Sequence, residues 1–210
     1  MSKLLIIRFS ALGDVAMLVP MIENLANIYP KLSITILSRK QVAPLFADMP
    51  DNVHFFGADL RGRHKGIKGM NRLLQDIDYQ QFDAVADMHD VLRSKYLRMR
   101  FRLIGKRVSV IQKGRISKFL LIKKHHFSPS LPSTIERYQG VLQRLGLSIQ
   151  LHPQQHNGGE RIGIGIAPFA AHKGKIYPLK KMEEVVRLLS KVGEPIYLFN
   201  TEKQEQTILK

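Results

Sequence analysis

The sequence predicts an α/β protein in which a doubly wound parallel sheet carries helices on both faces. Short apolar runs rich in β-branched residues alternate with longer segments whose apolar residues recur every three or four positions, as parallel βαβ units require. A mostly polar stretch at residues 151–159 then separates a long first part from a shorter second part with the same alternation. We therefore expect a complete domain over residues 1–155 and the beginning of a second over residues 156–210.

The first strand and helix are expected within residues 4–28. Residues 4–8 form an apolar run, and Ser10 to Gly13 form a turn. From Asp14 the apolar residues recur at helical spacing until Pro30 ends the segment. Further strands are expected at residues 33–38, 52–56, 82–88 and 107–111, and helices at residues 42–47, 70–77, 93–103, 116–124 and 134–145. The last of these helices has a capping box, Ser133 with Glu136, and ends at Gly146.

The second part contains a predicted strand at residues 161–167, a helix at residues 179–192 and a strand at residues 195–200. A strand, helix and strand of about 40 residues cannot bury both faces of a sheet. We therefore expect this part to be the opening of a second domain that is incomplete within the 210 residues.

Composition excludes several classes of protein. A hydrophobic fraction of 44% is ordinary for a globular chain and argues against wholesale disorder. The absence of cysteine excludes a disulfide scaffold, a thiolate nucleophile and a cysteine-based zinc site. No apolar run approaches the roughly 20 residues of a membrane span, and the apolar run at the N-terminus is too short for a signal peptide. We therefore expect a cytoplasmic protein.

The charge predicts an anionic partner. The chain carries 33 Lys and Arg against 17 Asp and Glu, a formal net charge of +16. Residues 91–135 contain 12 basic residues and no acidic one, whereas solvated surfaces usually mix the two signs. A phosphorylated ligand, an anionic membrane surface or nucleic acid would meet this need. The chain lacks helix-turn-helix, zinc-finger and RNP patterns, which disfavours nucleic acid, but a non-catalytic domain that binds RNA or acidic lipid remains the alternative.

Two segments are candidates for chemistry. Residues 8–14 follow the first strand, at the edge where open α/β sheets bind their ligands, and bring Gly13 for close backbone approach and the Asp14 carboxylate at a helix start. Simple N-capping of the helix by Asp14 is the alternative. Residues 167–178 offer small residues and two lysines before a helix, which suits a phosphate, although a solvated basic loop would have the same composition.

Cofactor and metal chemistry are not expected. Gly163 and Gly165 form a G-x-G inside a strand without the third glycine of a dinucleotide fingerprint, which disfavours an oxidoreductase. Six histidines could in principle bind a metal, namely His89, His125, His126, His152, His156 and His172. Their spacing is not typical of a metal site, so we predict neither a metal nor a cofactor.

Four segments, in order along the chain, carry a family resemblance. They are Ile6-Ile7-Arg8-Phe9-Ser10-Ala11-Leu12-Gly13-Asp14-Val15 with Pro20, Asp87-Met88-His89-Asp90-Val91-Leu92-Arg93-Ser94, Glu136-Arg137-Tyr138 with Leu145-Gly146, and Lys175-Ile176-Tyr177-Pro178. Together they resemble the ADP-heptose:lipopolysaccharide heptosyltransferases, glycosyltransferase family 9. The fourth segment has tyrosine where the family has tryptophan.

The resemblance implies a GT-B fold, with two Rossmann-like domains, the first binding the acceptor and the second the nucleotide sugar. It assigns Asp14 as the base that takes a proton from the acceptor hydroxyl, and Lys175 as the group that neutralises the departing nucleoside diphosphate without a metal, with Lys173 as a rival. Acceptor binding falls to Ser10, Ala11, Leu12, Gly13, His89 and Arg93, and donor-phosphate binding to Pro168, Phe169, Ala170, Lys173 and Lys175.

The implied reaction is an inverting transfer of a heptose or related sugar from an ADP-sugar to a phosphorylated, lipid-linked saccharide of the lipopolysaccharide core. The implied partners also include the anionic inner face of the membrane, where each nearby Lys or Arg contributes about 1 kcal/mol of attraction. The family's D-x-G-x-x-H segment, which contacts the donor, has no counterpart in these residues. The resemblance therefore leaves open whether the 210 residues transfer sugar on their own.

Overall fold

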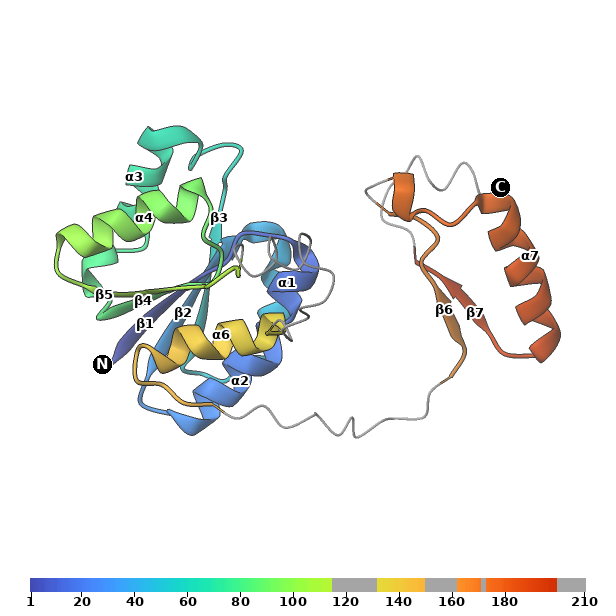
Figure 1. Cartoon of the computed structure of the whole chain (residues 1–210), viewed down its shortest axis with the longest axis horizontal. Coiled ribbons are helices and arrows are strands. Elements are labelled where there is room, and N and C mark those ends of the chain that lie inside the picture. The colour runs from blue at the N-terminus through green and yellow to red at the C-terminus, as the bar shows by residue number, and fades with distance from the viewer. Residues whose placement is uncertain (115–131, 150–161, 171–172, 200–210) are drawn as a thin grey trace, which may run out of the picture. The chain divides into compact units, whose positions relative to one another are not determined.

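The structure, a computed structural model, describes residues 1–114, 132–149, 162–170 and 173–199. The chain divides into two compact units, Met1–Pro153 (unit 1) and Gln154–Lys210 (unit 2), which are described separately (Figure 1). Several predicted features lie outside the described residues. They are the helix at residues 116–124, the polar stretch at residues 151–159, the basic residues Arg115, Lys118, Lys123 and Lys124, and the histidines His125, His126, His152, His156 and His172.

Unit 1 is built on a five-stranded parallel sheet with the order β3-β2-β1-β4-β5. The strands are β1 (Lys3–Ile7), β2 (Ser33–Arg39), β3 (Val53–Ala58), β4 (Ala84–Asp87) and β5 (Arg107–Val110). Every neighbouring pair is parallel, and β1 lies at the centre between β2 and β4. The predicted doubly wound parallel sheet is confirmed.

Helices cover both faces of this sheet (Figure 1). Leu4 and Ile6 of β1 face a core shared with α1 (Leu12–Ala16), α2 (Val19–Ile28) and α6 (Thr134–Gln143). Leu5 and Ile7 face a second core shared with α3 (Gly66–Asp76) and α4 (Leu92–Leu103). These four side chains are fully buried, as the central strand of a parallel sheet requires, and only Lys3 at the start of β1 is exposed.

The first helical segment differs from the prediction. The sequence predicts a single helix starting at Asp14, but the structure has α1 and α2 separated at Met17 and Leu18. Pro20 lies in the first turn of α2, where its missing N–H and fixed φ are tolerated. The expected helix at residues 42–47 is the 3₁₀ helix η1 (Lys40–Phe46), and a further 3₁₀ turn, η2 (Tyr79–Gln81), precedes β4.

The predicted cap of α6 is confirmed. The backbone N–H of Glu136 donates to the Ser133 hydroxyl at 3.2 Å, and the Ser133 N–H donates to the Glu136 carboxylate at 2.6 Å. These two bonds lower the pKa of Glu136, chiefly through the Ser133 backbone N–H. Gly146, with φ of +83°, follows the helix in the left-handed region that favours glycine. The cap fixes where α6 starts, and α6 supplies a buried tyrosine to the site described below.

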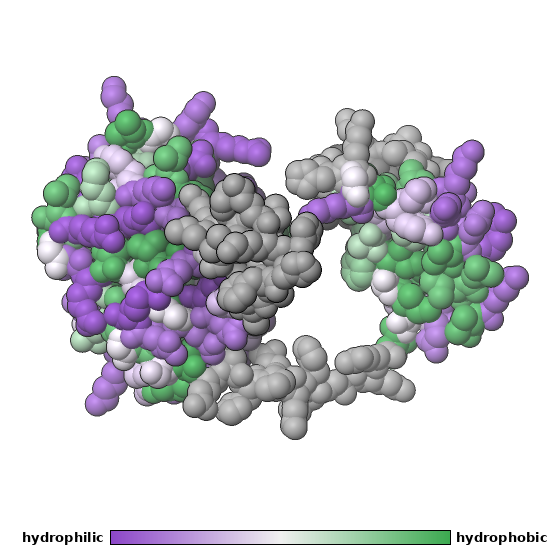
Figure 2. Space-filling view, viewed as in Figure 1, coloured by the Kyte–Doolittle hydropathy of each residue, from purple (hydrophilic) through white to green (hydrophobic). Residues whose placement is uncertain are grey.

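Unit 2 contains two parallel strands, β6 (Ile164–Ile166) and β7 (Ile196–Leu198), the helix α7 (Leu179–Leu189) and the 3₁₀ turns η3 (Lys173–Lys175) and η4 (Ser190–Val192). None of the α7 residues is buried. Tyr197, Leu198 and Phe199 are 53%, 45% and 64% exposed. Figure 2 shows the resulting hydrophobic area on this unit. Across both units, no helix within the described ranges has the length and apolar content needed to cross a bilayer.

Candidate functional site

The site lies at the carboxyl ends of the parallel strands of unit 1. The connection after β1 leads to α1 on one face of the sheet, whereas the connection after the neighbouring β4 leads to α4 on the other face. Diverging connections of this kind leave a crevice at the sheet edge, where open α/β sheets bind ligands. The segment from Arg8 to Asp14 therefore meets the segment from Met88 to Val91 in this crevice.

A cavity of about 640 Å³ occupies part of this edge. Four of the residues predicted to bind the acceptor line it, namely Ser10, Ala11, Leu12 and Arg93. The rest of its lining comes from Phe9, Arg39, Gln41, Val42, Ala58, Asp59, Leu60 and Arg61. Gly13 and His89, also predicted for the acceptor, do not line it.

Asp14 does not line this cavity, but it follows the lining residues Ser10, Ala11 and Leu12 in the same loop. It is the third residue of α1, and Ala11 is the N-cap, so the alternative in which Asp14 is the N-cap residue is wrong. Its Oδ2 nevertheless accepts the Ala11 backbone N–H at 3.3 Å and forms an ion pair with the Arg8 guanidinium. The Asp14 side chain is 35% exposed, which leaves the carboxylate accessible to a ligand.

Arg8 and Tyr138 both contact Asp14 and hold it in place. Arg8 is only 8% exposed, and its guanidinium also donates to the Met88 carbonyl. Its Cζ lies 5.7 Å from the centroid of the Tyr138 ring, and the Tyr138 hydroxyl donates to the Asp14 carbonyl at 3.1 Å. Burial raises the pKa of Tyr138 to about 12, so the phenol remains a hydrogen-bond donor. Both the side chain and the backbone of Asp14 are thus fixed from the protein side.

His89 bridges the β4 connection to the β1 connection. Its Nδ1 accepts the Phe9 backbone N–H at 3.4 Å, and its Nε2 lies 3.2 Å from the Ser10 hydroxyl. Burial, with the positive charges of Arg8 and Lys113 adding to it, lowers the pKa of His89 to about 4. A neutral ring whose Nδ1 accepts must carry its proton on Nε2, which therefore donates to Ser10. The Ser10 hydrogen is then free to point at a ligand in the cavity.

The β4 connection is itself held by the fully buried Asp87. Its Oδ1 accepts the backbone N–H groups of His89 and Asp90, each at 2.9 Å. Its Oδ2 accepts Arg98 at 3.1 Å, and Arg98 also pairs with Asp90 at 2.9 Å. Asp87 in the D-x-[HQ]-x-x-x-R-S segment therefore positions His89 and does not face the cavity.

Three arginines give the cavity a positive rim. Arg39, Arg61 and Arg93 are exposed, and none forms an ion pair with a residue in the described ranges. The one carboxylate in the lining, Asp59, accepts the backbone N–H groups of Gly62 and Arg63 at 3.0 and 3.3 Å, and these bonds lower its pKa. Because the Asp59 carboxylate already accepts backbone N–H groups of its own loop, the three arginines determine the charge preference of the cavity, which favours an anionic ligand.

The low pKa of His89 predicts an acid-sensitive stability. The unfolded chain binds this proton near pH 6.5 and the folded chain only near pH 4, so the free energy of unfolding falls as pH drops through this window. The free energy of unfolding should therefore fall by roughly 1–2 kcal/mol less in His89→Gln than in the unsubstituted protein between about pH 6.5 and 4.5. Urea denaturation at both pH values measures this difference. The exposed His54→Gln is the control. An unchanged loss in His89→Gln would show that this ring is not buried neutral.

The predicted donor residues lie in unit 2. Pro168 is buried and Phe169 and Ala170 are half-buried in the segment that follows β6, and Lys175 is exposed at the end of η3. Lys173 begins the same turn. The structure describes Lys175 and Asp14 in separate units.

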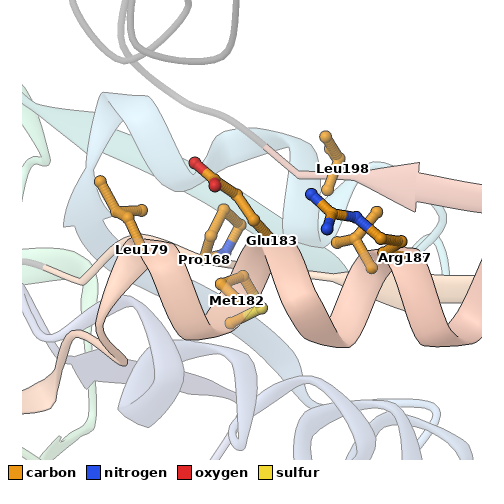
Figure 3. Close-up of a pocket in the computed structure, with 7 residues that line it drawn as sticks. Pro168, Leu179, Met182, Glu183, Arg187 and Leu198 are labelled. Atoms are coloured by element: carbon orange, nitrogen blue, oxygen red, sulfur yellow. The ribbon is translucent and has the colours of Figure 1, made fainter.

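A second hollow, of about 300 Å³, lies between α7 and β7 in unit 2 (Figure 3). Leu179, Met182 and Val186 of α7, with Pro168 and Leu198, make most of its lining apolar, and Glu183 and Arg187 complete it. An apolar lining that includes a carboxylate does not suit a diphosphate, so the predicted phosphate contacts are not assigned to this hollow.

Sequence reasoning missed the roles of Arg8, Arg39, Arg61 and Tyr138. Arg39 ends β2 and Arg61 follows β3, so their position at the carboxyl ends of parallel strands was a usable signal. No comparable signal existed for the contact of Arg8 with Tyr138, which joins β1 to α6. No group of three metal-ligand side chains occurs among the residues that the structure describes, and the predicted absence of a metal stays a prediction.

Comparisons with known proteins support the family resemblance. No protein-family model matches the chain. The lipopolysaccharide core heptosyltransferase OpsX of Haemophilus influenzae is 23% identical over 145 residues, which make up 69% of this chain and 41% of that relative. The chain thus spans less than half the length of this curated relative.

Two solved structures share the fold. A family 9 glycosyltransferase from Veillonella parvula aligns with a TM-score of 0.72 and 18% identity, over 99% of this chain and 65% of that one. The E. coli heptosyltransferase WaaC with ADP-2-deoxy-2-fluoro heptose aligns with a TM-score of 0.69 and 17% identity, over 97% of this chain and 70% of that one. The predicted GT-B type of α/β fold and the predicted resemblance to heptosyltransferases are confirmed.

Proposed function

We propose that this chain, which resembles the heptosyltransferases of glycosyltransferase family 9, serves an inverting, metal-independent transfer of a heptose or related sugar from an ADP-sugar to a phosphorylated lipopolysaccharide-core saccharide. In this proposal residues 1–155 bind the acceptor and residues 156–210 begin the part that binds the nucleotide sugar. The observation that carries the proposal is the accessible Asp14 carboxylate, held by Arg8 and the Ala11 N–H. It follows the loop residues that line a cavity together with three arginines.

Asp14 acts as the general base. An acceptor hydroxyl in the cavity donates its proton to the Asp14 carboxylate while its oxygen attacks the anomeric carbon of the donor sugar. The new carbon–oxygen bond forms on the face opposite the leaving group, so the configuration inverts. Because Arg8 pairs with the Asp14 carboxylate and Tyr138 bonds to the Asp14 carbonyl, the loop needs little reorganisation when the acceptor hydroxyl binds.

The bond from the anomeric carbon to the diphosphate breaks in the same step, and ADP leaves with the bonding electrons. Lys175 neutralises the charge that develops on the departing diphosphate, with Lys173 close to it in sequence. Pro168, Phe169 and Ala170 line the donor side. This assignment carries over from the family motif.

The acceptor is an anionic saccharide. Arg39, Arg61 and Arg93 pair with its phosphate or carboxylate groups, and Ser10 donates its hydroxyl hydrogen to an acceptor oxygen because His89 already donates to Ser10. Ala11, Leu12 and Gly13 shape the wall beside Asp14. The reaction takes place in the cytoplasm, at the inner face of the membrane where a lipid-linked acceptor would lie.

Isothermal titration tests this assignment of the acceptor. We expect the chain to bind a deacylated, heptose-free, phosphorylated core saccharide, and Arg93→Ala to weaken this binding about tenfold or more. Arg72→Ala removes an exposed arginine of α3 outside the cavity and should leave binding unchanged. Mass spectrometry of the saccharide then measures transfer of heptose from ADP-heptose.

A failure would take a definite form. Binding of short RNA without binding of the saccharide or of ADP would contradict the proposal and favour a polyanion-binding domain that uses residues 91–135. Equal weakening by Arg93→Ala and Arg72→Ala would show that the saccharide responds to overall charge and not to the cavity.

A further inference from the structure

The outer face of α4 carries apolar side chains that take no part in the core. Leu92, Met99 and Leu103 are 84%, 48% and 72% exposed and recur at helical spacing along one side. On the opposite side, Leu97 and Phe101 are fully buried against the sheet. The three exposed residues therefore present an apolar stripe to the surroundings of unit 1.

Positive charge flanks this stripe. The helix sequence LRSKYLRMRFRL contains five basic residues and no acidic one. Arg98 pairs with Asp87 and Asp90, but Arg93, Lys95, Arg100 and Arg102 form no ion pair with a residue in the described parts of the chain. Figure 2 shows hydrophilic and hydrophobic residues interleaved on this unit. The outer face of α4 thus combines cations with exposed apolar side chains.

The same face is hollowed. A depression of about 290 Å³ is lined by Lys95, Arg98, Met99, Arg102 and Leu103. Its polar lining is entirely cationic, and its apolar lining consists of one methionine and one leucine. Such a depression suits a phosphate group attached to an apolar chain.

We propose that the outer face of α4 docks on the surface of an anionic phospholipid bilayer. Lys95 and Arg102 pair with lipid phosphates, while Leu92, Met99 and Leu103 enter the boundary between headgroups and acyl chains. The interleaving of charge and exposed leucine favours a bilayer over single-stranded nucleic acid, whose bases stack on aromatic side chains. On α4 the aromatic side chains point elsewhere, since Phe101 is buried and the Tyr96 hydroxyl donates to Asn71.

Docking through this face would also bring the cavity of unit 1 close to the bilayer. Leu92 is the neighbour of Arg93, which lines the cavity. A bilayer against the N-terminal end of α4 would therefore lie next to the proposed acceptor site, within reach of a saccharide still attached to its lipid. This orientation rests on the proposed function, whereas docking on the bilayer does not.

Vesicle co-sedimentation tests the proposal. Vesicles made of phosphatidylglycerol and phosphatidylcholine in about equal parts are compared with vesicles of phosphatidylcholine alone. We expect binding only to the anionic vesicles. The double variant Lys95→Ala with Arg102→Ala should weaken this binding about 30-fold, because each of the two lost cations contributes roughly a fivefold gain in affinity for an anionic surface. The exposed pair Lys180→Ala with Lys181→Ala, on α7, removes the same charge and should change binding less than about twofold.

A second variant separates a bilayer from a general polyanion. Leu92→Ser with Leu103→Ser keeps every charge, and should weaken vesicle binding several-fold because two exposed apolar side chains no longer enter the bilayer. Absence of binding to anionic vesicles would overturn the proposal. Equal losses in the α4 and α7 charge variants, or vesicle binding that the serine variant leaves unchanged, would also overturn it.

A parallel assay keeps this proposal distinct from the proposed function. Transfer to a water-soluble, deacylated saccharide should be unchanged in both α4 variants, since these residues face the bilayer and not the cavity. Vesicle binding without any binding of the saccharide or of ADP would leave docking in place and contradict the proposed function. Transfer without vesicle binding would contradict docking alone.

Discussion

Replacement of Asp14 by asparagine is expected to lower kcat for sugar transfer by roughly 10²–10⁴-fold, the usual contribution of a general base. An amide keeps the size of the carboxylate and can still accept the Ala11 N–H, so the loop and the cavity should retain their shape. KM for the acceptor should therefore stay close to its original value. The measurement is steady-state transfer from ADP-heptose, in a preparation in which the unsubstituted protein is active.

The matched control is Asp48→Asn, the same chemical change at an exposed position outside the cavity. It should leave kcat unchanged. The Asp14→Asn protein also loses the ion pair with Arg8, so a thermal melt must show that it still unfolds cooperatively. A folded Asp14→Asn protein with full kcat would remove Asp14 from the reaction.

Asp87→Ala is expected to cost about 3 kcal/mol of unfolding free energy, the lower end of the range for breaking a buried ion pair. The substitution leaves the backbone N–H groups of His89 and Asp90 without their buried acceptor, and it leaves Arg98 with Asp90 as its remaining carboxylate partner. In a chain of this size the melting temperature should fall by about 6–12 °C. Urea denaturation at neutral pH measures the loss.

Asp90→Asn is the comparison that isolates the buried carboxylate. Asp90 also pairs with Arg98, but Arg98 keeps Asp87 as a partner when Asp90 is neutral, and asparagine tolerates the φ of +50° at this position. Its cost should stay below about 1 kcal/mol. Equal costs for the two variants would mean that Asp87 does not organise the β4 connection.

The sequence predicted the fold because periodicity and burial agree in a parallel sheet. The run at residues 4–8 contains only apolar residues up to Arg8, and β1 is the central strand whose two faces are both covered. The break between α1 and α2 was not predicted, because Val15, Leu18 and Ile22 keep helical spacing across it and all three are buried in the same core. Periodicity reports which face is buried, not whether the backbone between two turns stays helical.

The site was predicted in part. Family motifs marked residues 8–14 and 87–94, and the structure brings these segments together through His89 and Ser10. The support from Tyr138 could not be predicted from spacing, because it depends on where α6 crosses the sheet. Arg39 and Arg61 fall outside every motif, and only the common edge of the parallel strands joins them to Arg93.

The large sequence separation between residues that meet in the site has a consequence for synthesis of the chain. The Tyr138 hydroxyl reaches back 124 residues to the Asp14 carbonyl, and His89 reaches back about 80 residues to Phe9 and Ser10. At roughly 5–20 residues per second, a ribosome needs about 6–25 s to add Tyr138 after Asp14. During that interval Arg8 emerges without the ring that later covers it. The first turn of the protein is therefore among the last parts to reach its final geometry.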